Sequence, residues 1–315
     1  MPSQQPSAGQ AARPLSVGAI ALVMLCCLSW GFNQIAIKLV LPEVPPFLQA
    51  TIRSLGALLV IGLIAQARGV KLWQRDGAWR AGLFAGVLFG IEFVLIYRGL
   101  MLTTASRAVV FLYTAPFFVA FGAYQLLHER LNRLQWGGLA LSFVGVALAI
   151  GVPQPNVDAG VLLGDLMMIG GGALWAATTL IVKTTRLGRV PAEKGLGYQV
   201  AVSIPILALA AWLSGETVPQ WPTPLSLALM AYQAVWVVGL TFLLWFGLVK
   251  TYSASKLSSF TFITPLFGVA AGYLIMDDPL TPTFGVAALL VTAGLYLVNR
   301  PAPRAEPAAR PDRTA

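Results

Sequence analysis

The chain has 315 residues, of which 57% are hydrophobic and 10% are charged, with a formal net charge of +9 and a mean hydropathy of +0.75. A soluble globular domain has roughly 25% charged and 45–50% apolar residues, so a soluble fold of this length would lack polar side chains for its surface. The composition therefore excludes a cytosolic enzyme and a nucleic-acid-binding protein, and it predicts a chain that crosses a membrane several times.

Ten apolar stretches are long enough to cross the hydrocarbon core of a bilayer, which needs about 20 helical residues. In chain order they are 17–37, 46–66, 79–99, 105–126, 134–152, 161–182, 196–214, 225–248, 255–275 and 283–299. The first follows Pro14 and is too long for the apolar core of a signal peptide, so we expect a retained helix. Residues 1–16 and 300–315 are polar or rich in Pro, Ala and Arg, and we expect two disordered tails.

The basic residues are concentrated in alternate loops. With ten spans and a cytoplasmic N-terminus, 17 of the 21 Lys and Arg residues lie on the cytoplasmic side. Loops 153–160, 215–224 and 276–282, on the other side, contain neither Lys nor Arg. Cytoplasmic loops carry an excess of basic residues, and one span more or fewer would reverse every later loop. We therefore predict a multi-pass protein of the bacterial inner (plasma) membrane with both termini in the cytoplasm.

The two halves of the chain repeat one another. Chemically distinctive residues recur in register, at a shift of 149 residues for Pro116 with Pro265 and Glu129 with Asp278, and at a shift of 145 for Trp30 with Trp175 and Lys38 with Lys183. Because each repeat has five spans, an odd number, the second copy enters the bilayer from the opposite side. We predict an all-α membrane protein of ten transmembrane helices in two inverted five-helix repeats, 17–152 and 161–299. The two lysines are expected to extend to opposite membrane interfaces.

Short motifs in both halves resemble those of the EamA-type carriers of the drug/metabolite transporter superfamily. The motifs are Leu28–Ser–Trp–Gly31, Tyr97–Arg98–Gly99–Leu100, Thr104–Ala–Ser106 and Ser253–Ala–Ser255, together with the proline pair and the acidic pair of the repeat. The resemblance covers roughly 17–299 and is specific for fold and weak for substrate. It implies ten helices around a central cavity, with export of metabolites or amino acids as the common activity. Glu92, in the third span, is not part of the family pattern.

Arg53 and Glu92 are the charged residues that lie well within the predicted spans. Each lies seven residues from the outer end of its span, so their depths match and we expect them to pair or to share one cavity. A charge in the bilayer core is costly, which leaves two interpretations open. The two residues form a buried ion pair that locks the second span to the third, or Arg53 binds a substrate carboxylate while Glu92 binds a proton or a cation.

Aromatic and polar residues of the spans complete a candidate substrate cavity. A wall of aromatic and small side chains suits an amphipathic organic molecule better than a bare ion. The candidate cavity residues are Trp30, Asn33, Arg53, Glu92, Tyr97, Tyr113, Trp175 and Trp245. Pro116 and Pro265 occupy equivalent places in the fourth and ninth spans, where proline removes a backbone donor and bends a helix. They are interpreted either as simple kinks or as a paired hinge for alternating access.

The residues give no support to an enzyme, a metal site or a cofactor. The single histidine, His128, lies at a helix end, and no cluster of metal ligands accompanies it. Cys26 and Cys27 are adjacent in the first span and cannot bridge each other comfortably. The G-x-x-x-x-G-K-[ST] motif is absent from the sequence, so we do not expect direct ATP drive.

We therefore predict a secondary transporter that exports a small organic metabolite, such as an amino acid, by alternating access around a central cavity. Its expected partners are the substrate and the lipid bilayer, with no nucleic acid. One alternative is proton-coupled efflux of cationic drugs through Glu92, and a less favoured one is a channel or scaffold. The sequence leaves open the substrate, the direction, a coupling proton and the oligomeric state.

Overall fold

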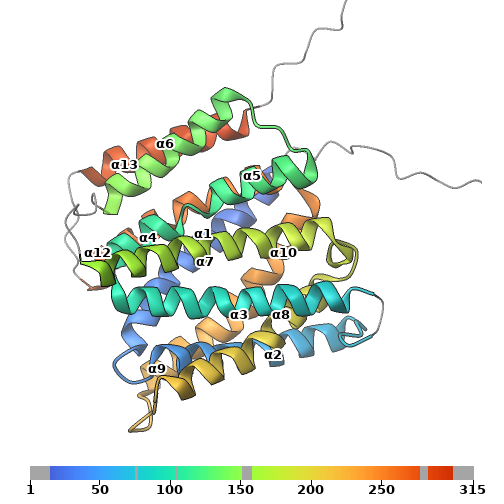
Figure 1. Cartoon of the computed structure of the whole chain (residues 1–315), viewed down its shortest axis with the longest axis vertical. Helices are drawn as coiled ribbons and strands as arrows, with labels where there is room; N and C mark the ends of the chain where they lie inside the picture. The colour runs from blue at the N-terminus through green and yellow to red at the C-terminus, as the bar shows by residue number, and fades with distance from the viewer. Residues whose placement is uncertain (1–14, 75–76, 104, 151–157, 277–282, 301–315) are drawn as a thin grey trace, which may run out of the picture.

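The computed structural model describes residues 15–74, 77–103, 105–150, 158–276 and 283–300, which fold into helices joined by turns, with no strand among them (Figure 1). The predicted tails fall almost wholly outside this range. The elements are α1 (Val17–Val40), α2 (Pro46–Ala67), α3 (Trp79–Leu102), α4 (Ala105–Leu112), α5 (Ala115–Leu127), α6 (Arg133–Ile150), α7 (Ala159–Thr184), η1 (Arg186–Gly188), α8 (Ala192–Leu213), α9 (Pro224–Ala231), η2 (Tyr232–Thr241), α10 (Phe242–Thr251), α11 (Ala254–Ser259), η3 (Phe260–Ile263), α12 (Thr264–Met276) and α13 (Thr283–Asn299).

The described helices form ten apolar segments, which confirms the predicted number of spans. Eight segments are long and apolar enough to cross a membrane, and α6 and α13 are two shorter apolar helices. Three of the eight are composite: α4 with α5, α9 with η2 and α10, and α11 with η3 and α12. Since the number of spans is even, α1 begins at the end of the bundle where α13 ends. We call this the terminal end, and the end that carries turns 41–45 and 214–223 the opposite end.

Helices of the two halves pack against each other in equivalent pairs. Helix α1 packs on α12, and its repeat counterpart α7 packs on α5. Helices α2 and α8, which correspond to each other in the repeat, are also in contact, as are α6 and α13 (Figure 1). The interface between the halves is therefore approximately symmetric, because equivalent helices make equivalent contacts across it. The centre of the molecule lies between the two repeats.

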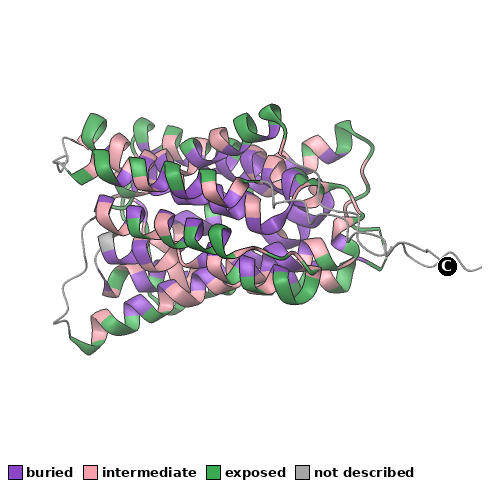
Figure 2. Cartoon of the chain, turned by 90° about the horizontal axis from the view of Figure 1, so that it is seen from above, coloured by how far each residue is buried: buried purple, intermediate pink, exposed green. Residues whose placement is uncertain are grey.

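Large apolar side chains cover the outer faces of the bundle, as expected of a surface that faces lipid. Leu59, Leu274 and Leu289 are each more than 70% exposed. Buried residues lie on the inner faces of the same helices (Figure 2). Exposure of so many leucines to water would be energetically unfavourable, whereas their exposure to the hydrocarbon core of a bilayer is favourable.

Two equivalent spans are broken ahead of their prolines. Helix α4 ends at Leu112 and α5 begins at Ala115, so that Pro116 lies in the first turn of α5. In the ninth span, the 3₁₀ segment η3 precedes α12, whose second residue is Pro265. Proline suits the first turn of a helix because the missing N–H has no partner there. The prolines thus begin new helical segments, which differs from the expected bend within a continuous helix. A hinge at these breaks stays a prediction.

Helices α6 and α13 approach closely at glycines, which gives a first testable prediction. A Cβ atom on Gly294 would lie 2.5 Å from the carbonyl oxygen of Gly138 and 2.2 Å from Ser142 Oγ. Overpacking of this kind costs about 1–3 kcal/mol. We expect Gly294→Ala to lower the melting temperature of the purified protein in detergent. Gly285→Ala, on the same helix, is the matched control, because its Cβ would have no atom within 4 Å. Equal effects of the two changes would contradict the explanation.

Candidate functional site

A cavity of about 150 Å³, which we call the main cavity, lies between the two repeats. One water needs about 10–15 Å³ of such a volume, so the main cavity is large enough for a small organic molecule. Seven of the eight predicted cavity residues line it: Trp30, Asn33, Arg53, Glu92, Tyr97, Tyr113 and Trp175. Ile37 of α1 and Leu100 of α3 also line it, so it extends from the middle of the bundle toward the opposite end.

Arg53 and Glu92 share the main cavity without pairing. Both residues are 3% exposed. No ion pair within 4.0 Å joins them in the part of the chain that the structure describes. The Arg53 guanidinium instead lies 4.3 Å from the centre of the Phe93 ring, a cation–π arrangement. Of the two interpretations that the sequence left open, the ion pair that locks two helices is therefore not formed in this structure.

Four buried polar atoms around the main cavity have no hydrogen-bond partner among the described residues. They are Asn33 Oδ1, Arg53 Nε, Glu92 Oε2 and the Tyr97 hydroxyl oxygen. The great majority of buried polar atoms in proteins are satisfied by protein or water, so four unsatisfied ones in one place require an explanation. Arg53 and Tyr97 offer donors, whereas Asn33 and Glu92 offer acceptors. The cavity can therefore hold a molecule that carries both acceptor and donor groups.

Trp245 is the predicted cavity residue that lies outside the lining of the main cavity. Its ring stacks on Trp175 with centroids 5.5 Å apart and meets Trp30 edge-on at 5.4 Å. Trp30 Nε1 donates a hydrogen bond of 2.8 Å to Thr241 Oγ1, which fixes the Trp30 ring. The three rings line a small space of about 30 Å³ on the terminal side of the main cavity, which we call the Trp cavity.

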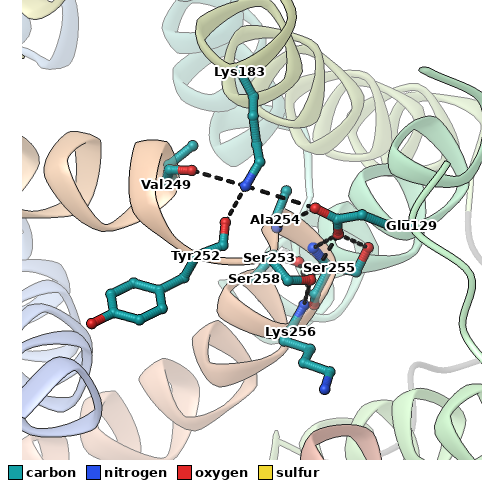
Figure 3. Close-up of polar contacts among 9 residues, drawn as sticks. All are labelled: Glu129, Lys183, Val249, Tyr252, Ser253, Ala254, Ser255, Lys256 and Ser258. Atoms are coloured by element: carbon teal, nitrogen blue, oxygen red, sulfur yellow. Dashed lines mark hydrogen bonds and ion pairs between the residues drawn. The ribbon is translucent and has the colours of Figure 1, made fainter. Parts of the chain in front are cut away.

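The carboxylate of Glu129 ties α5 to the start of α11 at the terminal end (Figure 3). Its two oxygens accept hydrogen bonds from the backbone N–H groups of Ala254 and Ser255, at 3.1 and 3.2 Å. They also accept bonds from the hydroxyls of Ser253 and Ser255, at 2.7 and 3.0 Å. A carboxylate at a helix N-terminus is stabilised by these donors and by the helix dipole.

Lys183, at the end of α7, joins the same cluster. Its amino group lies 3.7 Å from Glu129 Oε1 and donates hydrogen bonds to the carbonyl oxygens of Val249 and Tyr252 (Figure 3). We call these contacts of Glu129, Lys183, Val249 and residues 252–255 the Glu129 cluster. Lys183 lies at the terminal end and Lys38 near the opposite end, as expected of residues at opposite interfaces. The Lys183 side chain, however, is 15% exposed and bonds to protein groups instead of extending freely.

The Glu129 cluster was not recognised from the sequence. Its members are up to 126 residues apart, so no local pattern brings them together. The alignment of the two repeats contained a hint of it, because Glu129 aligns with Asp278 and Lys183 aligns with Lys38. Asp278 lies outside the described residues. Lys38 is exposed and Lys183 is not, so the two lysines differ in exposure although they occupy equivalent positions of the repeat.

A second buried ion pair, also missed, lies toward the opposite end. Arg107 of α4 donates to both carboxylate oxygens of Asp165 in α7, with Nε at 3.2 and 3.1 Å. The Thr103 hydroxyl donates to the same carboxylate at 2.7 Å. Both charged residues are less than 10% exposed. The pair therefore connects α4 to α7.

The two cysteines have hydrogen-bond partners in the protein. Cys26 and Cys27 are buried free thiols, and each donates to a backbone carbonyl at 3.5 Å, Thr241 and Phe260 respectively. In the described part of the chain, no group of three or more His, Cys, Asp or Glu residues is placed to hold a metal ion.

Comparison with known proteins gives consistent results over nearly the whole chain. Residues 17–151 and 162–300 each match the EamA-like transporter family. The uncharacterised transporter YvbV of Bacillus subtilis (strain 168) is 27% identical over 284 residues, which cover 88% of this chain and 90% of that protein. A probable amino-acid metabolite efflux pump of Escherichia coli (strain K12) is 28% identical, over 88% of this chain and 93% of its own length. A crystal structure at 20% identity matches with a TM-score of 0.75, over 89% of this chain and 96% of the other.

Proposed function

Because this chain belongs to the EamA-like transporter family, we propose that it is a secondary transporter that exports a small organic metabolite, with amino acids as the substrate class. Two relatives, from Salmonella typhimurium (strain LT2) and Escherichia coli, are described as probable amino-acid metabolite efflux pumps, at 27% and 28% identity. At this identity the names support transport and leave the substrate to be argued from the site.

The observation that carries the proposal is the set of unsatisfied donors and acceptors in the main cavity. A zwitterion matches both kinds: its carboxylate accepts from Arg53 and Tyr97, while its ammonium donates to Glu92 and Asn33. The side chain of an amphipathic amino acid then packs on the aromatic wall, which includes Phe93. A cation alone would leave the buried guanidinium of Arg53 uncompensated, which disfavours the alternative of cationic drug efflux.

The proposed mechanism is alternating access between two arrangements related by the inverted repeat. The main cavity extends toward the opposite end, while the three Trp rings and the Glu129 cluster lie between it and the terminal end. With both termini in the cytoplasm, this arrangement is the outward-facing one. Export then requires the Glu129 cluster to open so that the substrate can load from the cytoplasm.

Transport in proteoliposomes tests the proposed substrate class. We expect saturable counterflow of L-leucine at a rate at least about tenfold above that of isoamylamine, which lacks the carboxylate, and of 4-methylpentanoate, which lacks the ammonium. Tenfold corresponds to about 1.4 kcal/mol, below the value of about 1.5–3 kcal/mol for a hydrogen bond to a charged group. Measurements with and without a pH gradient test a coupling proton. Preference for isoamylamine or tetraethylammonium would contradict the proposal and favour cation efflux.

A further inference from the structure

A cavity of about 610 Å³ at the terminal end is lined by positive charge, and we call it the basic cavity. It lies among the start of α3, the end of α7, η1 and the end of α10. Five cationic side chains line it: Arg80, Lys183, Arg186, Arg189 and Lys250. None of the described residues that line it is acidic.

The basic cavity continues the line of the main cavity and the Trp cavity. Trp30 and Trp175 line both the main cavity and the Trp cavity, so these two spaces adjoin. Val182 and Val249 line the Trp cavity, and the next residue of each helix, Lys183 or Lys250, lines the basic cavity. The three spaces therefore follow one another from the opposite end to the terminal end. The hydrogen bond from Lys183 to the Val249 carbonyl lies between the Trp cavity and the basic cavity.

The charge of the basic cavity is only partly satisfied by the residues that the structure describes. The amino group of Lys250 donates to the Val190 carbonyl at 2.6 Å, and Lys183 belongs to the Glu129 cluster. Arg80, Arg186 and Arg189 are exposed, and none of them forms an ion pair within 4.0 Å in the described part of the chain. The Arg80 guanidinium lies 5.3 Å from the centre of the Trp79 ring. Like charges around one hollow repel each other and concentrate a positive potential there, which attracts anionic groups.

We propose that the basic cavity is the loading site for the substrate on the cytoplasmic side, where it binds the carboxylate group of a small molecule before the Glu129 cluster opens. The inference rests on the proposed function and names a second binding place for the same chemical group that Arg53 would hold in the main cavity. Arg186 and Arg189 make the first contact with the carboxylate. Lys183, which is shared with the Glu129 cluster, connects occupation of the loading site to release of that cluster.

Thiol labelling tests the site without any need for transport. Thr184 lines the basic cavity and is exposed, so Thr184→Cys, in a background with Cys26 and Cys27 replaced by Ala, reports its potential. In detergent at low salt, we expect an anionic methanethiosulfonate to react about tenfold faster than a cationic one, relative to their rates with a free thiol. The preference should vanish in high salt, because the Debye length falls to about 3 Å at 1 M. L-Leucine and 4-methylpentanoate should slow the reaction, and isoamylamine should not.

A pair of double variants separates the local charge from the overall charge. Arg186→Gln with Arg189→Gln removes two charges from the basic cavity, and we expect the anion preference and the protection by carboxylates to be lost. Arg130→Gln with Arg133→Gln removes the same charge from the turn after α5 and from the first residue of α6, outside the cavity lining, and should change neither the anion preference nor the protection. An unchanged preference in the first variant, or an equal loss in both, would overturn the proposal.

Transport kinetics then separate loading from the later steps. With L-leucine supplied on the terminal side, the Arg186/Arg189 variant should raise the KM about tenfold with little change in kcat, and leave the KM from the opposite side unchanged. If the variant alters only the dependence on phosphatidylglycerol in the vesicles, the cavity binds a lipid headgroup and the proposal is wrong. Absence of L-leucine transport by the parent protein would refute the proposed function, whereas the labelling result would still decide whether the basic cavity binds carboxylates.

Discussion

Replacing Arg53 by Gln lowers kcat/KM for L-leucine in proteoliposomes by about 100-fold. The guanidinium is buried beside the main cavity, its Nε has no partner among the described residues, and glutamine keeps a polar group without the charge. Loss of a hydrogen bond to a charged group costs about 1.5–3 kcal/mol, and about 2.7 kcal/mol corresponds to 100-fold. The same variant should also lose its discrimination against isoamylamine, because a carboxylate would no longer be required to compensate Arg53.

Arg98→Gln is the matched control for Arg53→Gln. Arg98 lies on α3, is exposed, and does not line the main cavity, so transport by this variant should equal that of the parent protein. Arg53→Lys keeps the charge and loses the planar donor pair, and an intermediate rate is expected. A normal kcat/KM and normal selectivity in Arg53→Gln would rule out the carboxylate role, provided that the melting temperature shows a folded protein.

Removing the carboxylate of Glu129 is expected to open the terminal end of the bundle. Glu129→Ala deletes four hydrogen bonds to residues 253–255 and the contact with Lys183. A loss of about 2.7 kcal/mol, close to one bond with a charged group, already changes the ratio of two states 100-fold. Thr179 is 5% exposed and lines the Trp cavity, so Thr179→Cys reports the opening. Its rate of labelling by an impermeant thiol reagent from the terminal side should rise by about 100-fold.

Glu193→Ala controls for the loss of an acidic residue at the same end. Glu193 forms an ion pair with Arg68 and does not line the Trp cavity. Labelling of Thr179→Cys should therefore stay at the parent rate in this variant. Glu129→Gln keeps one acceptor oxygen and should give an intermediate rate. If Glu129→Ala left the labelling rate unchanged, the Glu129 cluster would not be what closes the terminal end.

The number of spans was predictable because bilayer thickness sets the length of a membrane-spanning helix. Apolar stretches of that length can be counted directly in the sequence. Arg53 and Glu92 could be placed at one depth by counting residues from the ends of their spans, and the structure puts both on the main cavity. Whether they pair depends on side-chain directions that the count does not give. The roles assigned to them stay predictions.

Other features depend on contacts between distant segments, which local patterns do not record. Trp245 is an aromatic residue of a predicted span, like the cavity residues, yet its ring stacks against Trp175 and lines the Trp cavity instead of the main cavity. The breaks in the fourth and ninth spans lie just ahead of the prolines, whereas the sequence pattern predicted each of these spans as one continuous helix. The π-helical segment η2 (Tyr232–Thr241) is also not identified beforehand by any residue in it.

The contacts of α2 with α8 and of α6 with α13 have a consequence for the ancestry of the fold. Each contact joins a helix to its own counterpart, so two separate copies of a single half, inserted in opposite directions, would already bury the same surfaces as an antiparallel homodimer. Fusion of two such copies therefore needs no new interface. A fused chain also allows the two halves to differ, as they do at Arg53 and Glu92, which lie in the first half alone.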